Sequence, residues 1–255
     1  MPILYLRKLT GLERSLRADI HLGLSLTFIA GAINAGGFVV VNQYTSHMTG
    51  IVSSMADGLI LGDLRFALAA LGSLLCFILG ATCTELMVNW ARGRQLQSEY
   101  ALPLILEAIL LLVFSFAGRK LHEHIGLFVS FTVMLLCFMM GLQNAIITRI
   151  SNAVIRTTHV TGIVTDIGIE LGKMFFWNRG IGREDETYVR ANRGKMFLLA
   201  NLLIMFFLGG VAGAFGFQFI GYLTGIFLSF VLFLLAMMPL IDDVRSRMKR
   251  KQRTD

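Results

Sequence analysis

The chain has 255 residues, of which 55 % are hydrophobic and 15 % are charged, and it contains only three prolines. This composition excludes an ordinary soluble domain, because several apolar runs reach the roughly 18 to 20 residues that a membrane-spanning helix needs. The formal net charge of +7 fits basic loops that set membrane topology better than it fits nucleic-acid binding, since the lysines and arginines cluster outside the apolar runs.

Six apolar runs predict an all-α integral membrane protein with about six transmembrane helices in a single domain, 1–255. The runs are 20–41, 64–90, 101–117, 126–147, 196–215 and 222–240. No apolar core of a cleavable signal peptide precedes them, so we expect the first span to act as an uncleaved signal anchor. Residues 1–19 and 242–255 are predicted to be cytoplasmic basic tails, the second lying against anionic headgroups.

A nine-residue stretch occurs twice in the chain. Residues 44–52 read Y-T-S-H-M-T-G-I-V, and residues 156–164 read R-T-T-H-V-T-G-I-V. Each copy follows a G-x-x-N-A motif that contains Asn34 in the first half and Asn144 in the second. Such self-similarity predicts two internal repeats, repeat A over 20–118 and repeat B over 126–241.

The two T-G-I-V motifs open short apolar segments, 49–61 and 161–173. At about 1.5 Å per residue each extends roughly 20 Å, which is less than the bilayer core of about 30 Å. Both segments also carry acids. We therefore expect re-entrant or surface half-helices, six full spans and inverted repeats. The alternative is that both segments cross, which would produce eight spans and parallel repeats.

Basic residues favour the bacterial cytoplasmic (inner) membrane with both termini cytoplasmic, but they barely separate the two topologies. Six spans would leave outside only Arg65, Arg119 and Lys120. Eight spans would leave outside only Arg92, Arg94, Arg149 and Arg156. Segment length and the acids therefore decide for six.

Two further features concern packing and partners. The one long connection, 175–195, mixes acids with arginines and is predicted to be a solvated cytoplasmic loop that can dock a partner. Glycines four residues apart let helices approach closely, either within the fold or between the protomers of a homodimer. These pairs are Gly209 with Gly213 and Gly221 with Gly225.

The repeated motif supplies the parts of a solute site. A helix that starts in mid-membrane exposes unpaired N–H groups and the positive end of its dipole, and paired discontinuous helices point to a transporter's binding site. The residues expected to bind substrate are His47, Thr49, Gly50, His159, Thr161, Gly162, Asn34 and Asn144. The residues expected to cap the helix starts are Thr45, Ser46, Thr157 and Thr158. The plainer alternative is a packed loop with structural histidines.

Acids inside apolar segments are candidates for a proton relay, because a carboxylate in a bilayer is costly and marks an ion path or a buried pair. They are Asp57, Glu85, Glu107 and Asp166. Partial solvation near the span ends would equally explain Glu85 and Glu107. No metal or other cofactor is expected, because nothing in the spacing brings the histidines and aspartates together. Enzyme activity is not expected either, since no nucleophile motif is present.

The T-S-H-M-T-G run after the first span, with T-D-I-G-I-E-L-G in the second half, resembles the YoaK-like family of largely uncharacterised bacterial inner-membrane proteins. The resemblance covers nearly the whole chain. Many members read H-M-T-G-N where this chain has Ile51, and many lack the second histidine, here His159. The resemblance implies a multi-span membrane fold and no particular substrate.

These patterns predict a transporter or channel for a small polar or anionic solute, with membrane lipids as its other partner and no nucleic acid. The alternative is a non-transporting sensor or assembly protein that acts through the loop 175–195 and the basic tail. A third hypothesis, an intramembrane enzyme acting on lipid, would require a bound metal or an activated nucleophile.

Overall fold

The computed structural model describes residues 16–96, 98–120, 125–151, 158–178, 185 and 187–251. These residues form eight helices and no strand. The helices are α2 (Leu16–Val41), α3 (Met48–Ile60), α4 (Leu64–Gly93), α5 (Ala101–Lys120), α6 (Ile125–Ile150), α7 (Val160–Phe175), α8 (Arg193–Phe219) and α9 (Leu223–Lys251). Residues 1–15 and 252–255 of the two predicted tails, residues 179–184 and 186 of the predicted loop, and Arg156 and Thr157 lie outside the described residues, while 242–251 of the second tail continue helix α9.

Five helices are long and apolar enough to cross a membrane, and they coincide with five of the six predicted spans. Their apolar parts are Asp19–Val41, Leu64–Gly93, Ala101–Gly118, Val129–Ile150 and Arg193–Phe219. The sixth prediction falls on α9, whose described apolar part, Leu223–Met237, is shorter than a span. The helical fold is therefore confirmed and is consistent with a membrane protein, while the count of six spans stays a prediction.

The helices divide into an inner and an outer set. Half or more of the apolar windows of α2, α5 and α6 is buried, and these helices hold most of the large, fully buried side chains. Only about a fifth of the windows of α4 and α8 is buried, although they are the most apolar of the five together with α5. A helix that is apolar on all sides yet exposed is suited to contact with lipid.

Helices of the two halves of the chain pack in a crossed manner. The most extensive contacts join α2 to α8, α4 to α6 and α5 to α9, so the first long helix of each half lies on the third helix of the other. Glycines permit these crossings, because a Cβ on Gly31 would overlap the carbonyl oxygen of Phe206, and one on Gly141 would overlap that of Phe77.

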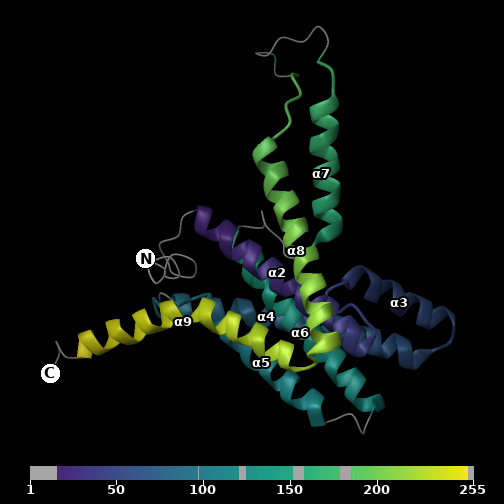
Figure 1. The fold of residues 1–255 in the computed structure, drawn as a ribbon, viewed down its shortest axis with the longest axis vertical. Coiled ribbons are helices and arrows are strands. Elements are labelled where there is room, and N and C mark those ends of the chain that lie inside the picture. The colour runs from purple at the N-terminus through teal and green to yellow at the C-terminus, as the bar shows by residue number, and fades with distance from the viewer. Residues whose placement is uncertain are drawn as a thin grey trace.

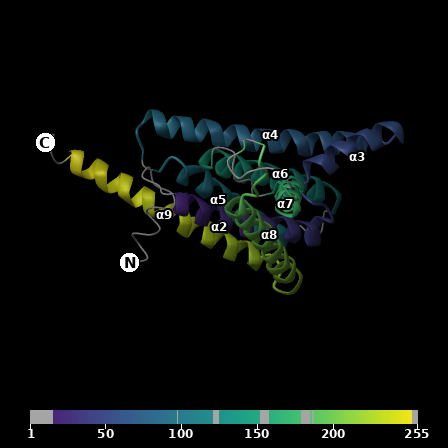
Figure 2. The same ribbon diagram turned by 90° about the horizontal axis from the view of Figure 1, so that it is seen from above.

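Each short helix forms a hairpin with the long helix that follows it. Helix α3 packs on α4 and α7 packs on α8, and Figures 1 and 2 show the two hairpins leaving the body in different directions. The α3–α4 turn uses Gly62 at φ +75°, and Asp63 then caps α4 by accepting a hydrogen bond from the Phe66 N–H (3.0 Å). The hairpin turn is thus built from local sequence.

Three of the four paired glycines serve packing within the chain, and the fourth, Gly221, forms a turn. Gly209 and Gly213 lie against the α2 backbone at Phe28 and Ala32. Gly221 adopts φ +71° in the turn between α8 and α9. A homodimer through these glycine-rich faces stays a prediction, since the α8 face at Gly209 is already covered by α2.

Candidate functional site

The two repeated motifs are tied to the body in the same way. The Oδ1 atom of Asn34 on α2 accepts hydrogen bonds from the backbone N–H (3.1 Å) and the hydroxyl (2.9 Å) of Ser46. The Oδ1 atom of Asn144 on α6 accepts one from the Thr158 hydroxyl (2.8 Å). Each asparagine therefore holds its own helix next to the short helix that follows it.

Both short helices begin at a histidine. His47 is the N-cap residue of α3 and His159 is that of α7, and neither side chain caps the first turn by a hydrogen bond. Instead each imidazole lies on a glycine of the first turn, because a Cβ on Gly50 or Gly162 would overlap the histidine ring. The glycines are therefore needed to make room for the rings.

The expectation that serine or threonine caps these helices is wrong for the three described residues concerned, Thr45, Ser46 and Thr158. The Thr45 hydroxyl is buried and has no hydrogen-bond partner among the described residues. Ser46 and Thr158 direct their hydroxyls to the asparagines of the preceding helices, as given above. Since no side chain of the N-cap residue fills the role, the first-turn N–H groups keep the capacity to bind another acceptor.

The motif side chains are open to the surroundings. His47, Thr49, His159 and Thr161 are all exposed. Figure 1 shows that α3 and α7 start beside the body and run outward from it. The helix starts are therefore accessible, and they belong to separate hairpins.

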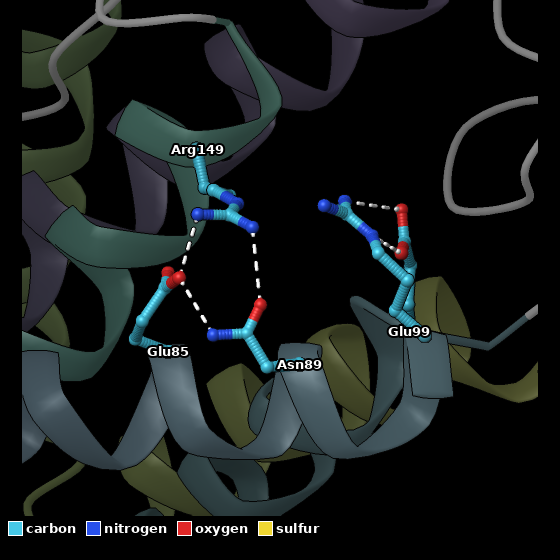
Figure 3. A network of polar contacts seen from close by, with 5 residues as sticks. Glu85, Asn89, Glu99 and Arg149 are labelled. Carbon is cyan, nitrogen blue, oxygen red and sulfur yellow. Dashed lines mark hydrogen bonds and ion pairs between the residues drawn. The ribbon is translucent and has the colours of Figure 1, made fainter. Parts of the chain in front are cut away.

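Glu85 takes part in a polar network at the α4–α6 contact (Figure 3). Its Oε1 atom accepts from Arg149 (2.6 Å) and from the Asn89 amide (2.9 Å), and Arg149 also donates to the Asn89 oxygen (3.2 Å). The Glu85 and Arg149 side chains are 45 % and 33 % exposed, so the pair is partly solvated and contributes little to stability.

Glu107 stands in the opposite environment. Its side chain is fully buried on α5, and neither carboxyl oxygen has a hydrogen-bond partner among the described residues. One residue further on, the Ala108 carbonyl accepts from the Ser229 hydroxyl of α9 (2.7 Å), which places Glu107 beside the α5–α9 contact. A buried polar group without a partner calls for an explanation such as a proton or an unseen ligand.

The two acids of the short helices that were predicted as proton-relay residues are not buried. Asp57 is exposed on α3. Asp166 on α7 forms an ion pair with Lys195 of α8 (3.0 Å). The predicted proton relay did not include Glu170, although the sequence places this acid in the same short segment. Glu170 is buried one turn after Asp166 and accepts from the Lys173 ammonium (2.9 Å) and from the Asn192 N–H (2.6 Å). The signal was the i, i+4 spacing of the two acids, which places them on one face of α7.

Hydrogen bonding lowers the pKa of Glu170 below its usual value, with the Lys173 side chain as the main cause and the Asn192 N–H as the second. Both stabilise the carboxylate form. Within the described residues no group of three metal-ligating side chains comes together. Cys76, Cys83 and Cys137 carry free thiols.

Comparison with known proteins adds the family. No curated protein and no solved structure matches the chain. One family model matches residues 22–238, which covers all the helices that carry the motifs described above. The chain therefore belongs to the family described as "Protein of unknown function (DUF1275)".

Proposed function

We propose that the protein is a transporter or channel of the bacterial inner membrane for a small polar or anionic solute. The observation that carries this proposal is the matched arrangement of the two short helices. In each, an asparagine holds the loop, an exposed histidine begins the helix, and a glycine makes room for its ring.

The matched arrangement favours an internal duplication. The crossed packing of α2 on α8 and α6 on α4 is what exchange of two related halves about an axis would produce. Transporters built from such repeats place their solute between discontinuous helices, with helix N-termini directed at anionic groups. The exposed Thr49 and Thr161 add hydroxyl donors at these positions, and the YoaK-like motifs agree with the family without naming a solute.

Glu107 would supply the coupled proton step. A fully buried carboxyl group without a partner costs stability, and such groups in membrane proteins serve proton or ion movement by default. Glu85, with its arginine partner, and Asp166, with its lysine partner, would set the path at the ends of the helices.

Site-directed thiol labelling tests the solvent path. Cys76, Cys83 and Cys137 are first replaced, and His47→Cys and His159→Cys are then introduced singly. Reaction of one site from each side of the membrane with an impermeant maleimide is expected from inverted repeats that line an aqueous path. If neither site reacts, the motifs are dry packing and the transport proposal fails.

Flux measurements test the residues. Proteoliposomes are screened with a panel of small anions and polar solutes, and His47→Ala and Thr49→Val are expected to abolish the flux found with the parent. Thr82→Val is the matched control, since this exposed hydroxyl bonds only the Ile78 carbonyl of its own helix. Glu107→Gln should retain binding but lose the pH dependence of flux. Unchanged flux in both motif variants would remove the assigned site.

A second candidate is a non-transporting sensor or assembly protein. The observation that favours it is the exposed aromatic cluster at the end of α7, where Phe175 and Trp177 are 79 % and 83 % exposed. This function predicts that deletion of 179–187 abolishes activity in cells while His47→Ala has no effect, which is the reverse of the transport result.

A further inference from the structure

A cavity lies where α7 ends and α8 begins, away from the two histidine motifs. Its volume is about 880 Å³, which falls within the usual range of roughly 300 to 1,000 Å³ for small-ligand pockets. Three cationic side chains line it, those of Lys173, Arg190 and Arg193, together with the amides of Asn178 and Asn192. We name it the α7–α8 cavity.

Side chains of α7 and of the segment after it hold the walls of this cavity in place. The Asn178 amide bonds both the N–H and the carbonyl of Val189, each at 3.0 Å, so it fixes the segment that leads into α8. The buried Glu170 carboxylate accepts hydrogen bonds from the Asn192 N–H and from the Lys173 ammonium, as described above. The cavity is therefore built by specific contacts.

The charge of the lining favours an anion. Of the described acids near it, Asp166 is paired with Lys195, Glu170 is paired with Lys173, and Asp185 accepts hydrogen bonds from Thr187. Arg190 and Arg193 form no ion pair within the described residues and are exposed. Two guanidinium groups are left to bind a ligand, and their planar donors match the oxygens of a phosphate group.

The surroundings of the cavity favour a lipid as the source of that phosphate. Arg193 is the first residue of an apolar segment of spanning length, so a span formed by α8 would place the cavity where the helix leaves the bilayer core. Phe175, Trp177 and Phe197 are exposed on the adjoining ends of α7 and α8. Aromatic side chains are enriched at this depth, and basic pockets at helix ends bind anionic headgroups.

We propose that the α7–α8 cavity binds the phosphate headgroup of an anionic phospholipid through Arg190 and Arg193, with the acyl chains lying along the exposed aromatic side chains. This site is separate from the two histidine motifs, which are proposed to bind the solute. It assigns to the described residues 188–193 the role of a lipid-binding element that anchors the projecting hairpin at the membrane surface.

Quenching of tryptophan fluorescence tests the proposal in the full-length chain. The sequence has two tryptophans, so Trp90→Phe leaves Trp177 beside the cavity as the only reporter. The protein is reconstituted in phosphatidylcholine vesicles that contain increasing brominated phosphatidylglycerol or, in parallel, brominated phosphatidylcholine. We expect brominated phosphatidylglycerol to quench Trp177 saturably, and at a lower mole fraction than brominated phosphatidylcholine.

Single substitutions show which residues bind the phosphatidylglycerol. Arg190→Gln and Arg193→Gln should each weaken the apparent affinity for phosphatidylglycerol about fivefold. Arg65→Gln, an exposed arginine at the start of α4, should leave it unchanged. The single variants keep the walls intact, because neither arginine forms an ion pair within the described residues.

Three results would overturn the proposal. Equal quenching by the two lipids would show that Trp177 merely lies in the bilayer. An equal loss in Arg65→Gln and in the cavity variants would show a general surface charge effect. Displacement of phosphatidylglycerol by millimolar inorganic phosphate, but not by chloride, would identify a free anion as the ligand in place of a lipid.

Discussion

At the scale of single residues, Asn34 fixes the loop that leads into α3. It is almost fully buried on α2, and one oxygen atom satisfies two donors of Ser46. Removing an acceptor inside a packed structure leaves its donors unsatisfied, which costs about 1–3 kcal/mol. The start of α3 therefore depends on a side chain twelve positions earlier in the chain.

Asn34→Ala is accordingly expected to lower the free energy of unfolding by about 1–3 kcal/mol. Asn201→Ala is the matched control, because the Asn201 amide bonds only the Phe197 carbonyl in its own helix and its loss should cost less than about 0.5 kcal/mol. Both are measured by denaturant titration in the same detergent. A double-mutant cycle with Ser46→Ala that shows no coupling would contradict the assigned contact.

Glu170 makes the stability of the α7–α8 hairpin depend on pH. Because its pKa is lowered in the folded state, its carboxylate stabilises the fold fully above the unfolded pKa of about 4.3, and the contribution is lost as pH falls through the lower folded value. The contribution of Glu170 should therefore be constant near neutrality and decrease in acid.

The measurement compares the parent with Glu170→Gln in thermal unfolding between neutral and acidic pH. We expect the parent to be more stable at neutral pH and the difference to shrink below about pH 4.3. A difference that grows in acid would contradict the assigned ion pair. Asp63→Asn, which alters the exposed cap of α4, controls for a general effect of removing a carboxylate from a helix hairpin.

At the scale of helices, packing depends on glycines at the crossings. Gly141 on α6 lies against the Phe77 carbonyl of α4, and Gly31 on α2 lies against the Phe206 carbonyl of α8. Backbone atoms cannot move aside as flexible side chains can, so these positions are intolerant of any added carbon.

Gly141→Ala and Gly168→Ala should therefore have effects of opposite sign. A methyl group on Gly141 meets the α4 backbone and should destabilise the protein by about 1–3 kcal/mol, whereas Gly168 on α7 faces open space, where alanine should stabilise the helix by up to about 1 kcal/mol. Unfolding titrations of the two variants provide the comparison. Equal effects would mean that α4 and α6 do not cross at this position.

At the scale of the whole molecule, the position of one residue, Arg94, distinguishes six spans from eight. Arg94 follows α4 and its guanidinium lies over the Trp90 ring at 4.6 Å. Six spans place it on the side of the termini, whereas eight spans place it on the opposite side. The Arg94 side chain is exposed, so we expect a substitution at this position to disturb the fold little.

Arg94→Cys in the chain without native cysteines should react with an impermeant maleimide from the cytoplasmic side only. This result follows from six spans, since the short helices are too short to cross. Asp185→Cys is the control, because both topologies place it on the cytoplasmic side. Labelling of Arg94→Cys from the outside would establish eight spans and parallel repeats.

Much of the fold was predictable because it depends on local properties of the chain. Helices α4 and α8 are apolar over the length of a span, which the residue pattern alone reveals. The starts of α3 and α7 also follow from the T-[ST]-H-x-T-G motif to within a residue or two. The N-cap was not predictable from the sequence. The hydroxyls of Ser46 and Thr158 could bond either the first turn of the helix or an asparagine, and only the fold brings the asparagine near.

The sequence by itself determined which segments are helical and identified the five helices that are long enough to span a membrane, because these properties depend on residue type and spacing along one segment. Only the tertiary structure decided that α2 lies on α8, that Glu107 has no hydrogen-bond partner among the described residues and that Lys173, Arg190 and Arg193 share a cavity. Those outcomes depend on contacts between residues far apart in the chain. Such contacts form only when all the helices pack together, so the pattern of one segment cannot predict them.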